Sequence, residues 1–137
     1  MILNNMKDIR WEQRFENFEK AYLFFEKNLK RDNFSLLEEL WLLQSFEFTF
    51  ELSWKTMKDY LSFNWVDVKS PREAIKEAYS MWIIDNADIW LEMLVKRNEL
   101  THIYDEWLID WSIDLIKWKY FINIKKVFIF LKTKLND

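Results

Sequence analysis

The chain of 137 residues contains no cysteine, no glycine, one proline and one histidine. Without cysteine it can form neither a disulfide nor a thiolate zinc site, and it has no cysteine nucleophile. No apolar run approaches the about 20 residues that a membrane-spanning helix needs. The N-terminal sequence lacks the basic-then-apolar order of a secretion signal. We therefore expect a cytoplasmic protein that is not associated with a membrane and uses neither a metal ion nor another cofactor.

The absence of glycine coincides with a high number of tryptophans, nine in all. Glycine makes up about 7% of an average chain, and it commonly occupies the left-handed position that follows a helix. Trp41, Trp65 and Trp82 stand where a helical protein would place such a residue. One interpretation is that the gene uses UGA for glycine and has been decoded with tryptophan there. The alternative is a genuinely tryptophan-rich chain.

Hydrophobic periodicity predicts helices along the whole chain, and no segment has the alternating pattern of a strand. Ser70 and Glu73 flank Pro71 in a strong helix-start signal, with the serine as cap and the glutamate completing a capping box. Short connections favour antiparallel neighbours. We therefore expect an all-α, four- to five-helix up-down antiparallel bundle in a single domain, residues 1–137. The expected helices span approximately 8–30, 36–63, 70–81, 85–102 and 108–134.

Charge is distributed unevenly along the chain. The net charge is −3, so the molecule as a whole does not attract nucleic acid. Between residues 115 and 137, however, six lysines stand against a single aspartate. A basic last helix could bind phosphates, but a solvated lysine face on an amphipathic helix explains the pattern equally well.

The stretch KRNELTHIYDE, residues 96–106, holds the only histidine. On a helix with 100° per residue, Arg97 and Tyr104 lie nearly in line, and Asn98 and His102 form the adjoining row of an outward-facing strip. Histidine can take the proton of an RNA 2′-hydroxyl or protonate the leaving 5′-oxygen. Arginine can stabilise the extra negative charge on phosphorus. The pattern is compatible with metal-independent RNA cleavage, or with a polar helix end that has no catalytic role.

RNA cleavage of this kind commonly uses both an acid and a base, whereas the chain has one histidine. A two-fold symmetric dimer in which the two strips face each other would supply two. We therefore expect a homodimer.

Three segments resemble the helical partner of minimal nucleotidyltransferases, the nucleotidyltransferase substrate-binding proteins of the HEPN superfamily. They are FEFTFELSWKTMKDYL (46–61), SPREAIKEAY (70–79) and DIWLEMLVKRNELTHIYDE (88–106). The resemblance covers roughly residues 9–120, in order and nearly without gaps. It implies a helical bundle like the C-terminal domain of kanamycin-type nucleotidyltransferases.

The resemblance also implies a function. HEPN ribonucleases carry an arginine, a polar residue and then a histidine, which correspond here to Arg97, Asn98 and His102. The tyrosine added in the toxin subgroup corresponds to Tyr104. The chain would then be a ribonuclease toxin, and a cognate nucleotidyltransferase encoded by an adjacent gene would neutralise it by attaching AMP to Tyr104. The adenylyl group would add bulk and negative charge beside the site and compete for Arg97.

A second interpretation of the same family is a non-catalytic subunit that positions a substrate for the nucleotidyltransferase. The chain lacks the glycine-serine and paired-aspartate signature of those enzymes, so we do not expect it to transfer nucleotides itself. Glu51 and Lys55, in the first of the matching segments, are weaker candidates for contacts with that partner. Whether the chain is itself an enzyme, and which RNA it would cut, stays open at this stage.

Overall fold

The computed structural model describes residues 2–100 and 105–135, and within these ranges all regular structure is helical. None of the helices there is long and apolar enough to cross a membrane. The observed elements confirm the expected all-α bundle. They are α1 (Ile2–Leu29), α2 (Leu36–Phe63), α3 (Pro71–Ser80), α4 (Ala87–Leu100), α5 (Glu106–Leu115), the π-helical turn η1 (Ile116–Tyr120) and α6 (Phe121–Leu135).

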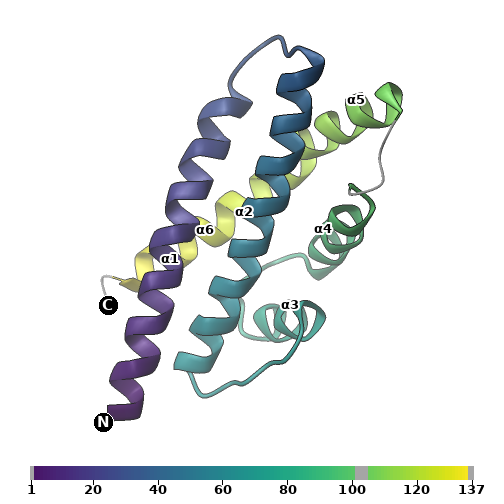
Figure 1. Ribbon diagram of the computed structural model, residues 1–137. Helices are drawn as coiled ribbons and strands as arrows, with labels where there is room; N and C mark the ends of the chain where they lie inside the picture. Colours follow the sequence, from purple (N-terminus) through teal and green to yellow (C-terminus); the bar gives the residue numbers. More distant parts are fainter. Residues whose placement is uncertain (1, 101–104, 136–137) are drawn as a thin grey trace.

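The two longest helices, α1 and α2, run antiparallel and side by side (Figure 1). The run formed by α5, η1 and α6 crosses behind them, with α5 against α2 and α6 against α1. Helices α3 and α4 are short and lie along the other side of α2. Helix α2 therefore contacts every other α-helix of the bundle, as its long apolar repeat leads one to expect.

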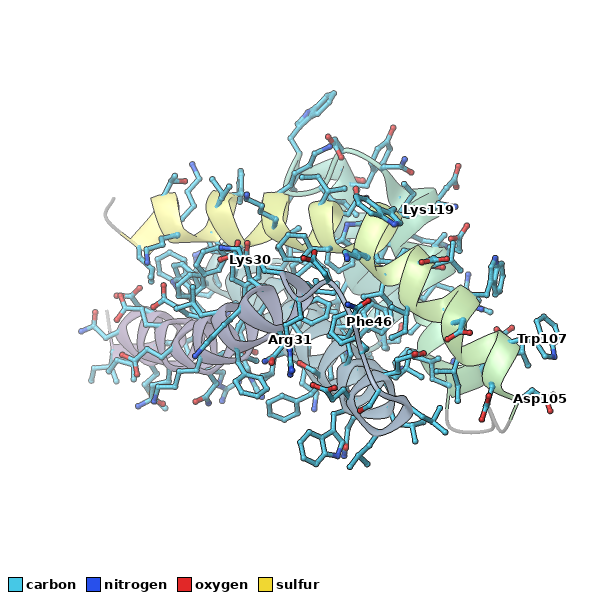
Figure 2. The ribbon with its side chains drawn as sticks, turned by 90° about the horizontal axis from the view of Figure 1, so that it is seen from above. Lys30, Arg31, Phe46, Asp105, Trp107 and Lys119 are labelled. Atoms are coloured by element: carbon cyan, nitrogen blue, oxygen red, sulfur yellow. The ribbon has the colours of Figure 1, made fainter. Side chains whose placement is uncertain are left out.

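Aromatic side chains join the helices in the core. Tyr22 of α1 stacks on Phe128 of α6 with ring centroids 4.2 Å apart, and Phe50 of α2 stacks on Trp90 of α4 at 5.7 Å. Phe46, labelled in Figure 2, is fully buried between α1 and η1. Such ring pairs contribute about 0.5–1.5 kcal/mol each beyond the burial of their apolar area. The pairs fix α4 and α6 against the α1–α2 layer.

Serine caps start two of the helices. The Ser35 hydroxyl accepts from the Glu38 N–H at 3.2 Å, and the Glu38 carboxylate accepts from the Ser35 N–H at 3.0 Å, a complete capping box for α2. At α3 the Ser70 hydroxyl accepts from the Glu73 N–H, as expected, but the Glu73 carboxylate accepts from the N–H of Lys69. The serine cap and the helix start at Pro71 are thus confirmed, whereas the expected capping box is wrong, because the Glu73 carboxylate bonds to the residue before the cap.

Two tryptophans adopt the left-handed conformation that favours glycine. Trp65 follows the C-cap of α2 with φ 65°, and Trp82 follows the C-cap of α3 with φ 62°. In both places the next residue donates its N–H back into the last turn; Val66 bonds to the Leu61 carbonyl at 2.8 Å, and the equivalent bond after α3 measures 2.9 Å. This is the Schellman motif, in which the residue after the cap has positive φ.

Trp41 does not share this geometry, so the expectation of a positive φ there is wrong. It lies inside α2 and is 64% exposed. Trp107, which projects outward near the start of α5 in Figure 2, is also exposed. The nine tryptophans thus separate into a buried group, Trp11, Trp54 and Trp90, and an exposed group, Trp41, Trp65, Trp82, Trp107, Trp111 and Trp118.

The start of the first helix and the hydrogen-bond pattern of the last helical run differ from what periodicity predicts. Helix α1 begins at Ile2, well before residue 8, and the last helical run changes to π-type hydrogen bonding at η1, where the Phe121 N–H bonds to the Ile116 carbonyl. The buried Asn123 amide donates to the Lys119 carbonyl at 2.9 Å, which satisfies a carbonyl beside this wider turn. A π turn shifts the helical register, and apolar spacing alone does not reveal such a shift.

Candidate functional site around Arg97 and Glu51

Arg97 lies in the last turn of α4, and its side chain packs against α2. Its Nη1 donates to Oε2 of Glu51, and only 25% of the Arg97 side chain is exposed. The helical spacing placed Arg97 on an outward-facing strip. The structure instead turns its guanidinium onto α2, because the carboxylate there provides a charged partner at a partly buried position.

Glu51 is one member of a charged row on α2. Glu47, Glu51 and Lys55 are four residues apart and therefore share one helix face. Lys55 Nζ lies 3.4 Å from Oε1 of Glu51, so the two carboxylate oxygens of Glu51 face two different cations. Burial raises the pKa of Glu47, and the positive charge of Arg97 partly opposes that rise. The row thus balances the charge of Arg97 from within the chain.

The guanidinium of Arg97 lies over the ring of a buried aromatic residue. Its Cζ lies 6.0 Å from the ring centroid of Phe50, which is fully buried. Nε of Arg97 is also buried and has no hydrogen-bond acceptor among the residues described. An unsatisfied buried donor destabilises by about 1–3 kcal/mol. The Nε–H of Arg97 is therefore shielded from solvent and has no acceptor among the described residues.

A second cation stands next to Arg97 on α4 but faces α5. The Lys96 side chain is 9% exposed, with Nζ 3.3 Å from Glu99 and 4.3 Å from the Trp111 ring centroid. Nothing in the sequence pattern singled out Lys96. Val95, the residue before Lys96, is 48% exposed despite its apolar side chain.

Of the other residues predicted for the site, the structure describes Asn98 but not His102 or Tyr104. Asn98, in α4 directly after Arg97, has an exposed side chain. His102 and Tyr104 lie outside the described residues, so their catalytic and modification roles stay predictions. The site that can be described is therefore Arg97 with Glu51, Lys55 and Glu47. The sequence suggested Glu51 and Lys55 only for partner contacts, separate from Arg97, because no local pattern relates residues 46 positions apart.

Several lysines near the C-terminus pair with acidic residues of the same chain. At least three of them form ion pairs with acidic residues of α1, of α4 and of the segment before α4. Such pairs partly neutralise the basic face that could have bound phosphates. The pairs are Lys132 with Glu19, Lys119 with Glu92 at 3.0 Å, and Lys126 with Asp85 at 3.1 Å.

An acidic cluster that the sequence pattern did not indicate joins α2 to α5. Burial, followed by the neighbouring carboxyl of Asp110, raises the pKa of Glu39 to about 7. Glu106 and Asp114 of α5 raise it further through their negative charges. The residues described contain no group of three or more acidic or histidine side chains arranged to hold a metal ion.

Comparison with known proteins places these residues in a family. A sequence model of the family described as nucleotidyltransferase substrate binding protein like matches residues 13–133. The chain belongs to this family. The match includes α2 and α4, and so both sides of the Arg97–Glu51 contact.

A solved structure supports the fold. The chain is similar to a protein from Thermus thermophilus known from a crystal structure, with a TM-score of 0.76 and 24% identity. The similarity covers 88% of this chain and 99% of that one. None of the curated proteins matches the chain. The family description also relates the chain to a nucleotidyltransferase partner.

Proposed function

We propose that this chain is the HEPN-type toxin subunit of a two-component toxin–antitoxin system, a metal-independent endoribonuclease. Its cognate nucleotidyltransferase neutralises it by transferring AMP to Tyr104. The observation that carries the proposal is the position of Arg97. It is partly desolvated and held by Glu51 in the last turn of α4, and Asn98, His102 and Tyr104 follow it at the spacing of the toxin subgroup.

The chemistry follows from these residue types. The Arg97 guanidinium binds the scissile phosphate and stabilises the charge that develops on phosphorus, an effect that is stronger at a partly buried site than in water. His102 exchanges a proton with the reacting oxygens, and Asn98 orients it. Two copies of the chain form a homodimer that brings the two sites together around the RNA.

The antitoxin acts through charge. AMP on the Tyr104 oxygen places a phosphodiester anion two residues from His102 and seven from Arg97 along the chain. A guanidinium binds phosphate in the bidentate manner in which it binds a carboxylate. The attached nucleotide therefore competes with RNA for Arg97. The gene for this nucleotidyltransferase is expected next to the gene for this chain, and its absence would weaken the two-component proposal sharply.

Cleavage of RNA by the purified chain in the presence of a metal chelator tests the ribonuclease. The wild type should cleave, and His102→Ala should be inactive while its circular dichroism and unfolding temperature stay unchanged. Cleavage that depends on added Mg²⁺, or that survives in His102→Ala, would contradict the proposal.

The alternative function is a non-catalytic subunit that positions a substrate for the nucleotidyltransferase. The description of the family favours it directly. In that case the chain should form a tight complex with the nucleotidyltransferase and stimulate nucleotide transfer to a third molecule. His102→Ala should leave this stimulation intact, whereas the toxin proposal expects Tyr104 of the chain itself to receive the nucleotide.

A further inference from the structure

Helices α1 and α2 leave one face of their layer uncovered. In Figure 1 the run from α5 to α6 crosses behind the pair and α3 and α4 lie beside α2, so no described element lies over the near face. Phe24 of α1 is 64% exposed, and Trp41 and Phe48 of α2 are 64% and 62% exposed. With Gln44 and Ser45 they line a hollow of about 470 Å³. The most exposed aromatic side chains of the two long helices thus gather at one place.

The size of this aromatic patch favours a partner that covers it. An aromatic side chain has about 150–250 Å² to bury, so three rings exposed to this extent leave about 300–450 Å² of apolar surface in water. The largest apolar patch of a typical monomer measures about 300–600 Å² and commonly marks an interaction site. Burial of this surface would favour association.

Contacts between α1 and α2 determine which of their residues lie at the same height. The Thr49 hydroxyl donates to the Ala21 carbonyl at 3.4 Å, and Arg14 Nε lies 3.0 Å from Oδ2 of Asp59. The helices are antiparallel, so a residue of α1 lies level with a residue of α2 when their numbers add up to about 70, as they do in these two contacts.

The solvent-accessible residues at matching heights are complementary in charge. Each helix carries an exposed or half-exposed row of one acid, one base and one phenylalanine, spaced by three or four residues so that they share a helix face. The level pairs are Glu16 with Lys55, Lys20 with Glu51, and Phe24 with Phe48. Turned through 180° about an axis parallel to the helices, this face meets itself with each acid opposite a base and ring opposite ring.

We infer from this pattern that the α1–α2 face binds the same face of a second copy of the chain, around a two-fold axis parallel to the two helices. Phe24 of each copy then packs on Phe48 of the other. Lys20 of one copy faces Glu51 of the other, which keeps its contact with Arg97 because a carboxylate has about four acceptor sites. The inference rests on the proposed function for the existence of a homodimer, and it does not depend on RNA cleavage.

The charge order favours a second copy over other occupants of the face. An RNA strand requires a basic surface, whereas the two rows hold as many acids as bases, Glu16 with Lys20 and Glu51 with Lys55. A different protein would need an independent surface with the reverse order of charges and rings. A second copy supplies that order through symmetry alone.

The first test measures the dissociation constant of the dimer by sedimentation equilibrium of the full chain. Phe24→Glu and Phe48→Glu each place a charge at two symmetry-related contacts, and we expect each to raise the dissociation constant at least about 100-fold. Ile129→Glu, at an exposed apolar position of α6, should dimerise like wild type. All three side chains are more than half exposed, so the helix content measured by circular dichroism should stay that of wild type.

The second test exchanges charges and leaves the rings in place, so it decides the question even if the ring variants do not fold. Glu16→Lys places like charges opposite each other in its own dimer, and so does Lys55→Glu. Each should weaken self-association about tenfold. An equimolar mixture of the two variants should form a heterodimer about as tight as the wild-type dimer, because opposite charges then face each other at both contacts. No recovery in the mixture would overturn the inference.

The remaining outcomes separate the face from the proposed function. A wild-type dimer that Phe24→Glu and Phe48→Glu leave intact would show that the copies meet through another face, which overturns the inference while the homodimer stands. Loss of nucleotidyltransferase binding in Phe48→Glu without a change in the dimer would assign the face to that partner instead. A wild type that stays monomeric would overturn both the face and the homodimer. RNA cleavage in the presence of a chelator reports the ribonuclease separately, since association is measured without RNA.

Discussion

Arg97 of α4 and Glu51 of α2, 46 residues apart in the sequence, form an ion pair that ties the end of α4 to the central helix of the bundle. Lys55 holds the other oxygen of the same carboxylate. Removal of Arg97 therefore does not leave Glu51 without a cation, whereas removal of Glu51 takes away the carboxylate that the partly buried guanidinium contacts. The two substitutions should differ in their effect on stability.

Arg97→Lys tests whether the shape of the guanidinium matters beyond its charge. Lysine keeps the positive charge but loses the planar arrangement of donors that can join Glu51 and a phosphate. We expect a loss of RNA cleavage of at least about tenfold in kcat/KM, and a decrease of about 1 kcal/mol or less in the free energy of unfolding. Urea unfolding and cleavage assays measure the two effects. Arg72→Lys, an exposed change on α3, is the control. Full activity in Arg97→Lys would contradict a role for the planar guanidinium.

Trp65→Gly and Trp82→Gly should each stabilise the protein. Both residues have positive φ at the position after a helix cap, where a side chain with a Cβ is destabilising by about 1–2 kcal/mol relative to glycine. Each tryptophan is more than half exposed, so little apolar burial is lost. We expect the free energy of unfolding to rise by about 1 kcal/mol for each change, measured by urea denaturation.

Trp41→Gly provides the matched contrast, because Trp41 is comparably exposed but lies inside α2. Glycine within a helix is destabilising by about 0.5–1 kcal/mol, so this variant should be less stable than wild type. Stabilisation by all three changes, or by none, would contradict the conformational explanation.

The codons of the gene distinguish between the two interpretations of the tryptophans. UGA at positions 65 and 82 supports glycine in the natural protein, and UGG excludes it.

Glu39→Gln should stabilise the protein at alkaline pH more than at acidic pH. The pKa of Glu39 is raised from 4.5 to about 7 in the folded protein by burial and by Asp110. A carboxyl with a raised pKa contributes its full stability below pH about 4.5 and loses it as the pH rises through about 7. At pH 8 the wild type therefore holds a charged Glu39 in the acidic cluster, whereas glutamine stays neutral.

The measurement is the difference in free energy of unfolding between Glu39→Gln and wild type at pH 5 and at pH 8. We expect a difference of about 1 kcal/mol in favour of the variant at pH 8, and a smaller difference at pH 5. Glu16→Gln, at an exposed position of α1, serves as a control for the removal of one negative charge. A difference that is the same at both pH values would contradict the raised pKa.

Co-expression with the neighbouring nucleotidyltransferase should add the mass of one AMP to the chain. Tyr104→Phe should remain unmodified, because it lacks the acceptor oxygen, and should therefore stay toxic in the presence of the antitoxin. Intact mass and growth of the host report the two results. Tyr79→Phe, at an exposed tyrosine of α3, should be modified and neutralised like wild type. Modification of Tyr104→Phe would place the AMP on another residue.

Local patterns were sufficient for much of the fold. The apolar repeat of α2 and the Ser70–Pro71 signal of α3 predicted the observed helices, since spacing and caps act within a few residues. The periodicity missed the π turn at η1 and the early start of α1, because the first is a shift of hydrogen-bond register and the second depends on how far the helix extends past its neighbours.

The site divides in the same way. The sequence by itself suggested Arg97, Asn98, His102 and Tyr104 for the proposed chemistry, through their resemblance to the motif of the toxin subgroup. Only the tertiary structure decided that Arg97 turns onto α2 and meets Glu51, which also contacts Lys55. The physical reason is that the energy of an ion pair depends on distance and solvent exposure. Both are set by how α2 and α4 pack against each other, and no pattern within either helix specifies them.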